Sequence, residues 1–179
     1  MNHDLTNSST THIPEIYVAC LASYNNRILH GAWISLDQPL EDVLEQIKRM
    51  LEESPMPDAE EFAVHDFEHF GCLPVDEDDS IKDLHERAQF ILKHGELGVE
   101  VFAHYGNLKD AEETLRDYYM GEYESELDYA IHLFDECYSF NIPKRIKTYI
   151  DYDMFCRDIF ANDYFSVEVN GRCHVFMFH

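Results

Sequence analysis

Short apolar runs separated by polar breaks form the first pattern along the chain. Residues 16–22 and 28–36 are apolar and β-prone, and the polar break between them contains two asparagines. This arrangement predicts a β-hairpin. From Leu40 to Leu51 apolar residues recur every three or four positions, and this spacing predicts an amphipathic helix.

A third strand is expected over Phe62–Phe67, so the predicted order is ββαβ. The first domain is predicted over residues 15–70, behind a flexible leader over residues 1–14. The leader has neither the basic start nor the apolar run of a signal peptide. The chain also has no apolar run of about 18 residues, so no membrane span and a cytoplasmic location are expected.

The middle of the chain has helical periodicity alone. Ser80 and Asp83 form a capping-box pattern, and an apolar stripe then continues to Gly95. A second short helix is expected to end at Gly106. These features predict a small all-helical domain over residues 71–105.

The last part of the chain predicts a third domain, of helices and a β-hairpin, over residues 106–179. A helix from Leu108 is expected to end at Gly121, and a further helix is expected over residues 151–160. Asn170-Gly171, between two β-prone runs, predicts a tight turn. Another helix is expected between these two helices. It should bury one apolar face, formed by Leu127, Ala130, Ile131, Phe134 and Tyr138. The predicted fold class is α+β.

The charge of the chain is unusual for a folded protein. It has 36 Asp and Glu against 13 Lys and Arg, for a net charge of −23, while 12 Phe and 11 Tyr indicate a folded core. Solubility alone needs a net charge of only about 2–8. Residues 1–60, 61–105 and 106–179 carry −7, −8 and −8, so the excess is not an acidic tail. Basic surfaces are the expected partners, and direct binding to nucleic acid or to an anionic membrane is not expected.

Residues His65 to His69 match the H-x-x-E-H pattern of a zinc peptidase. That chemistry needs a helix, which brings both histidines to one side. The alternating pattern here favours a strand, so we expect no metal site, no cofactor and no enzymatic activity. The five cysteines are widely spaced without a C-x-x-C pair, which indicates reduced thiols.

Acidic residues before one predicted helix and along the surfaces of others are the candidate target-binding residues. Glu122 with Glu126, and Glu124 with Asp128, would form like-charged i, i+4 pairs if that region is helical. For any single stripe an ordinary solvated face is the simpler interpretation, and a halophilic protein would have a similar composition. The candidates are Asp76, Glu77, Asp78, Asp79, Asp83, Asp110, Glu113, Asp117, Glu122, Glu124, Glu126 and Asp128.

The amount of charge suggests imitation of DNA. Duplex DNA has one negative charge per about 1.7 Å of axis, so a net charge of −23 matches roughly 40 Å of duplex. Small domains in a row, each roughly 20–25 Å across, could span such a length. Carboxylates on one face would then present a phosphate-like field to a DNA-binding enzyme.

Three stretches of the chain resemble the ArdA family of antirestriction proteins. They are IYVACLASYNNRILHGAWISL, EEFAVHDFEHFG and YMGEYESELDYAIHLFDECYSFNIPKRIKTYIDYDMFCRDIFANDYF. The resemblance extends from about Ile16 to Phe176. Residues 127–140 resemble the segment called the antirestriction motif in that family, and their apolar spacing suggests a folding or interface element. The motif-like residues are Leu127, Asp128, Tyr129, Ala130, Phe134, Asp135 and Glu136.

The resemblance implies a function and an assembly. Members of the family are encoded on mobile elements, mimic bent B-form DNA and occupy the DNA-binding groove of type I restriction–modification enzymes. They are elongated, have three small domains in a row, and form homodimers through the C-terminal domain. Two other hypotheses stay open: an acidic adaptor or chaperone for another basic protein, and a metal hydrolase built on His65, Glu68 and His69.

Overall fold

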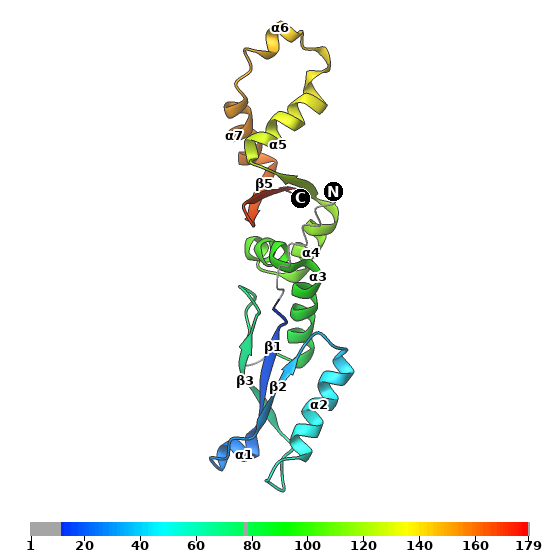
Figure 1. Ribbon diagram of the computed structural model, residues 1–179, viewed down its shortest axis with the longest axis vertical. Helices are drawn as coiled ribbons and strands as arrows, with labels where there is room; N and C mark the ends of the chain where they lie inside the picture. Colours follow the sequence, from blue (N-terminus) through cyan, green and yellow to red (C-terminus); the bar gives the residue numbers. More distant parts are fainter. Residues whose placement is uncertain (1–11, 77–78, 179) are drawn as a thin grey trace, which may run out of the picture. The chain divides into compact units, whose positions relative to one another are not determined.

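The computed structural model describes residues 12–76 and 79–178, which form two compact units that meet at Gly95 in the sequence (Figure 1). The chain is α+β, with one small antiparallel sheet in each unit. The division into three domains is not confirmed, because residues 71–95 group with the N-terminal unit and residues 96–105 with the C-terminal unit. Most of the predicted leader lies outside the described residues. Pro14, which was assigned to it, is buried and accepts a hydrogen bond from the Leu36 amide.

The sheet of the N-terminal unit confirms the predicted ββαβ order. Strands β1 (Glu15–Cys20), β2 (Gly31–Ser35) and β3 (Phe62–Glu68) are antiparallel, in the spatial order β2-β1-β3. Val18 at the centre of β1 is opposite Ala32 on one side and Val64 on the other. The central strand therefore supplies the buried middle of this sheet.

Strands β1 and β2 pair as the predicted hairpin, and their connection contains helical structure that was not predicted. A short helix, α1 (Leu21–Asn25), follows β1 directly. Ser23 within it is fully buried, and its hydroxyl lies 2.9 Å from the hydroxyl of Ser54. Because a buried hydroxyl needs a hydrogen-bond partner, this contact holds the helical turn against the unit.

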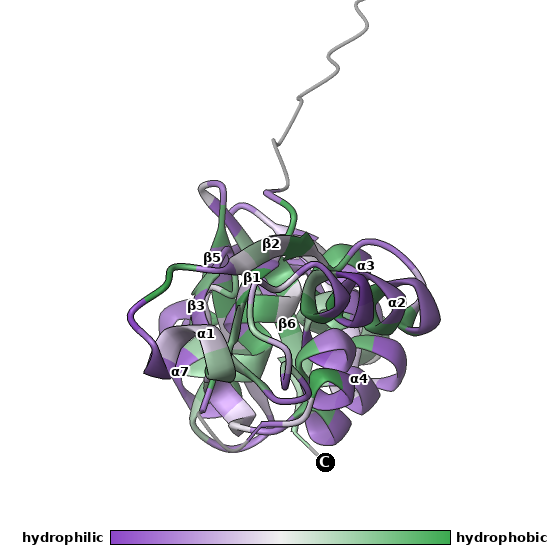
Figure 2. Cartoon of the chain, turned by 90° about the horizontal axis from the view of Figure 1, so that it is seen from below, coloured by the Kyte–Doolittle hydropathy of each residue, from purple (hydrophilic) through white to green (hydrophobic). Residues whose placement is uncertain are grey.

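Helix α2 (Leu40–Glu52) packs on the sheet through Val43, Ile47 and Met50. Figure 2 shows hydrophilic and hydrophobic stretches alternating along it, as the periodicity predicted. The largest fully buried apolar side chains of this unit are Ile16, Val18, Ile34, Leu36, Val43, Phe70 and Leu84.

Helix α3 (Ile81–Tyr105) is broken at Gly95, where φ is 59° and ψ is −150°. Two helices were predicted here, and this break confirms them. The first buries Leu84, Ala88 and Ile91 in the N-terminal unit. Its Gln89 side chain also donates a 2.7 Å hydrogen bond to the Leu36 carbonyl.

The sheet of the C-terminal unit has one strand more than the predicted hairpin. Strands β5 (Tyr164–Val169) and β6 (Arg172–Met177) confirm the hairpin, with positive φ at both turn residues. Strand β4 (Tyr119–Tyr123) pairs with the other side of β6. Gly121 was expected to end a helix and instead lies within β4, with φ of 124° beside an irregularity in the ladder. Only glycine takes this backbone conformation readily, so the helix-stop interpretation was wrong.

Three helices surround this second sheet: α4 (Leu108–Asp117), α5 (Glu126–Leu133) and α7 (Tyr152–Asn162). Their N-cap side chains each accept a hydrogen bond from a backbone amide in the first turn: Asn107 from Asp110, Ser125 from Asp128 and Asp151 from Met154. The core of the unit contains Tyr129, Ala130, Cys156, Ile159 and Val175.

The predicted apolar face after Ser125 is only partly correct. Tyr129 and Ala130 are buried, whereas Ile131 and Tyr138 are exposed. The α-helix ends at Leu133 and continues as a π turn (η1, Phe134–Tyr138) and a 3-10 turn (η2, Ser139–Asn141). A π turn has more residues per turn than an α-helix, so it rotates the following side chains away from the predicted stripe. A short helix, α6 (Lys144–Lys147), follows.

Candidate target-binding surface

No described carboxylate is fully buried. Across residues 12–76 and 79–178, Ser23 and Thr114 are the only buried polar side chains. The cost of burying an unpaired charge explains this distribution. The acidic excess is therefore available to a partner, although many individual carboxylates have partners within the chain.

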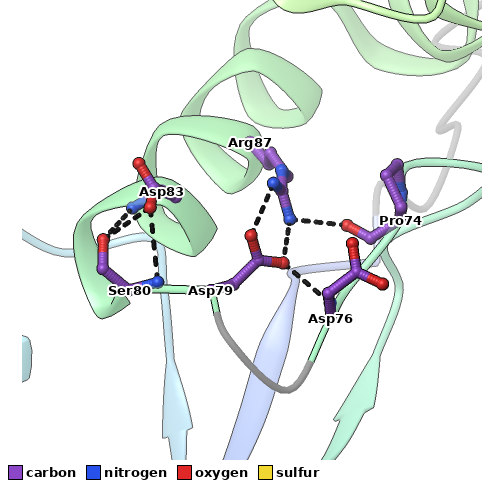
Figure 3. Close-up of polar contacts among 6 residues, drawn as sticks. All are labelled: Pro74, Asp76, Asp79, Ser80, Asp83 and Arg87. Carbon is purple, nitrogen blue, oxygen red and sulfur yellow. Dashed lines mark hydrogen bonds and ion pairs between the residues drawn. The ribbon is translucent and has the colours of Figure 1, made fainter.

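Asp79 is a largely enclosed candidate acid, and its contacts are drawn in Figure 3. Both of its oxygens accept hydrogen bonds from Arg87, one at 2.8 Å, and only 12% of its side chain is exposed. Arg87 also donates a 2.7 Å hydrogen bond to the Pro74 carbonyl. The hydrogen bonds from Arg87 lower the pKa of the Asp79 carboxyl below its usual range. Asp79 thus ties the loop after Pro74 to helix α3.

The neighbouring acids in this segment are placed differently. Asp76 is exposed, and its backbone amide donates to Asp79 at 2.7 Å (Figure 3). Asp83 and Ser80 form the predicted capping box, in which the Ser80 hydroxyl donates to the carboxylate at 2.7 Å. Hydrogen bonds from Ser80 lower the pKa of Asp83. Glu77 and Asp78 lie outside the described residues.

The candidate acids Asp110, Glu113 and Asp117 form one stripe on α4 through their i, i+3, i+7 spacing, and this stripe is only partly exposed. Asp110 is half-buried and accepts a 2.9 Å hydrogen bond from Asn107, the N-cap residue. Glu113 is half-buried, whereas Asp117 is exposed and accepts hydrogen bonds from Arg116 at 2.6 and 3.0 Å. One end of this stripe serves the helix cap, so the three acids do not form a uniform free face.

Glu122 and Glu124 lie at the sheet and not on a helix, which corrects the i, i+4 pairs considered above. Glu122 is in β4, and Glu124 follows the strand. Arg172, at the start of β6, donates a 2.6 Å hydrogen bond to Glu122 and has a nitrogen 3.7 Å from an oxygen of Glu124. Glu122 is opposite His174 in the ladder, two residues from Arg172, so Glu122 and Arg172 share one face of the sheet. Glu124 lies within reach of the same guanidinium. These three residues are called the sheet corner below.

Glu126 and Asp128 occupy the first turn of α5, where the helix dipole favours negative charge. Ser166 donates a 2.7 Å hydrogen bond to Glu126. Beside them is a hollow of about 330 Å³, whose lining includes Glu124, Glu126, Glu168 and Ser166. The first turn of α5 therefore continues the acidic surface of the sheet corner.

The motif-like segment divides between core and surface. Tyr129 and Ala130 are core residues and Leu127 packs against them, while Phe134 lies against Phe155. Asp128 is exposed, Asp135 accepts a 3.0 Å hydrogen bond from Lys147, and Glu136 is 3.6 Å from His132. The apolar half of the segment holds the C-terminal unit together, as its spacing suggested.

Sequence reasoning missed a group of aromatic and basic residues, most of them exposed, at the end of the motif-like segment and just beyond it. Phe140 and Tyr149 have 84% and 85% of their surface exposed. The signal was present, because three bases occur within four residues of a chain that has 13 in all. This aromatic–basic loop contains Tyr138, Phe140, Lys144, Arg145, Ile146, Lys147 and Tyr149.

The H-x-x-E-H residues do not form a zinc-binding helix. His65 is on strand β3 and packs edge-on against Tyr24, while His69 has a positive φ and stacks on His12. Within the described part of the chain no group of three or more His, Cys, Asp or Glu residues could hold a metal ion. No described helix is both long and apolar enough to cross a membrane.

A comparison with models of protein families finds a match for this chain. The model of a family described as "Antirestriction protein (ArdA)" matches residues 16–173. No curated protein matches the chain. The family resemblance expected from the sequence is therefore confirmed over nearly the whole chain.

Proposed function

This chain belongs to the ArdA family of antirestriction proteins, and we propose that it inhibits type I restriction–modification enzymes by presenting carboxylates in place of DNA phosphates. Antirestriction is the function that the family implies, and it is inhibition rather than catalysis. The mechanism and the type I target are the parts that we propose.

One observation carries the proposal: a net charge of −23 on a folded chain whose described carboxylates all reach the surface. Enzymes that bind DNA neutralise phosphates with lysine and arginine and release counterions. Carboxylates at comparable density would occupy the same basic groove. Electrostatic attraction would also speed the encounter of the two proteins.

The test is cleavage of unmodified DNA by a purified type I restriction enzyme, with the protein titrated at low and at high salt. Inhibition near enzyme stoichiometry is expected at low salt. It should weaken at high salt, because the Debye length falls from about 10 Å at 0.1 M to about 3 Å at 1 M. If a folded sample gives no inhibition at any ratio, the proposal is wrong. Recovery of a different basic protein in a pull-down would then favour the adaptor hypothesis.

We also propose that the C-terminal unit forms a homodimer through the aromatic–basic loop. Exposed aromatic side chains suit an interface, and Lys144 and Arg145 would complement the acidic surface of a second copy. A dimer would double the charged surface offered to the target.

Replacement of Phe140 and Tyr149 by Ala should lower the mass measured by light scattering to that of a monomer. Leu29→Ala, a similarly exposed apolar residue of the N-terminal unit, is the control and should leave the mass unchanged.

A further inference from the structure

The sheet corner places one cation between two carboxylates of a strongly acidic surface. Arg172 is 43% exposed, Glu122 48% and Glu124 82%, so all three are accessible to a partner. Arg172 is fixed by its place after the Asn170-Gly171 turn and by its pairing with Val169. Its planar guanidinium has several donors in fixed directions, so it can hold one carboxylate tightly while it attracts a second.

The ion pairs are not needed to build the sheet. Strands β4 and β6 already pair through Gly121, Glu122 and Tyr123, opposite Val175, His174 and Cys173. Exposed ion pairs contribute little to stability. The effect of Arg172 on its neighbours is instead to restrict the rotamers of two flexible glutamates, which would otherwise lose that freedom when a partner binds.

We propose that Arg172 is a positioning residue, which holds Glu122 and Glu124 in the arrangement that the target enzyme binds. This inference rests on the proposed function. A model in which only the total charge matters predicts the opposite effect on target binding when Arg172 is removed. If only the total charge mattered, removing the cation would strengthen binding. If arrangement matters, removing it weakens binding, because the glutamates must then be ordered at the target.

The experiment compares the inhibitory concentration of four full-length proteins in the type I cleavage assay. Arg172→Gln should raise the concentration needed for half inhibition by about fivefold or more, the lower end of the cost of ordering two long side chains. Arg157→Gln is the matched control, since it removes one positive charge from the same unit. Arg157 is exposed and donates a 3.1 Å hydrogen bond to the Asp153 carbonyl. This control should inhibit as well as the unchanged protein or slightly better. Arg172→Lys should recover part of the loss, because an ammonium can still pair with Glu122.

A second comparison separates positioning from a structural role. In the Glu122→Gln, Glu124→Gln background, Arg172→Gln should cause no further loss, since the residues through which it acts are no longer charged. A further loss of the same size in that background would overturn the proposal. So would Arg172→Gln inhibiting as well as Arg157→Gln. If the unchanged protein does not inhibit at all, the proposed function itself fails, and that outcome is distinct from both.

Discussion

Asp79 and the sheet corner use the same chemistry for different ends. Each joins arginine to carboxylate, yet 12% of the Asp79 side chain is exposed against 48% for Glu122. Arg87 donates hydrogen bonds to Asp79 from two nitrogens and also donates to the Pro74 carbonyl. This pair therefore holds the loop after Pro74 against helix α3. Arg172 joins strands that are already paired. In a chain with 36 acids, exposure and partners separate the carboxylates that hold the fold from those that can meet a target.

The largest effect should follow from Asp79→Asn, which leaves the enclosed Arg87 without its counter-charge. We expect the free energy of unfolding to fall by about 2–3 kcal/mol, slightly below the loss for a fully buried pair. Urea unfolding followed by circular dichroism measures it. Asp117→Asn is the matched control, because Asp117 also pairs with arginine but is exposed, and it should cost less than about 1 kcal/mol. Equal losses in the two variants would contradict the distinction.

The same pair predicts how stability depends on pH. Arg87 lowers the pKa of Asp79 in the folded state, so the pair stabilises the protein above the unfolded pKa of about 3.9. That contribution is lost as the pH falls through the lower, folded pKa. The difference in unfolding free energy between the unchanged protein and Asp79→Asn should therefore be constant from neutral pH to about pH 5 and shrink below about pH 4. A difference that stays constant to pH 2 would show that charge is not its source.

A smaller effect on stability is expected at the N-cap of α4, where the Asn107 side chain accepts a 2.9 Å hydrogen bond from the Asp110 amide. Asn107→Ala should lower the free energy of unfolding by about 1 kcal/mol. Inhibition by the folded variant should not change, because no carboxylate is removed. Asn162→Ala is the control, because it removes a side-chain amide that donates one hydrogen bond to the Asp158 carbonyl near the end of α7. It should lower the free energy of unfolding by less than Asn107→Ala. Loss of inhibition without loss of stability would assign Asn107 to the target surface instead.

The sequence predicted the fold best where one local signal decides the backbone. The Ser80–Asp83 box, the Asn170-Gly171 turn and the periodicity of α2 all appear as expected. It failed where tertiary pairing decides. Gly121 follows a helical pattern, and only its pairing partner β6 makes that segment a strand. Tyr129 is buried and Ile131 exposed because the sheet and α7 select the face of α5.

The candidate acids were harder to predict than the fold, because composition reveals charge but not the partners of each carboxylate. Nothing in the run around Asp79 marks it as enclosed, since its partner Arg87 is eight residues away. Glu122 and Arg172 are 50 residues apart and meet only through the sheet. A residue's place in an acidic stretch therefore does not decide whether it serves the fold or the target.

The smallest effect should come from Asp76→Asn, which sharpens the comparison with Asp79 three residues away. Asp76 is exposed, and its backbone amide, which the change leaves in place, makes the contact to Asp79. The equilibrium constant of unfolding and the half-inhibitory concentration should each stay within about twofold of the values for the unchanged protein. The reason is that one charge in a distributed field contributes at most a few tenths of a kcal/mol. Adding substitutions of other exposed acids, such as Asp128, should multiply such small losses. If Asp76→Asn alone abolishes most inhibition, the target reads a single contact, and mimicry by a distributed field is wrong.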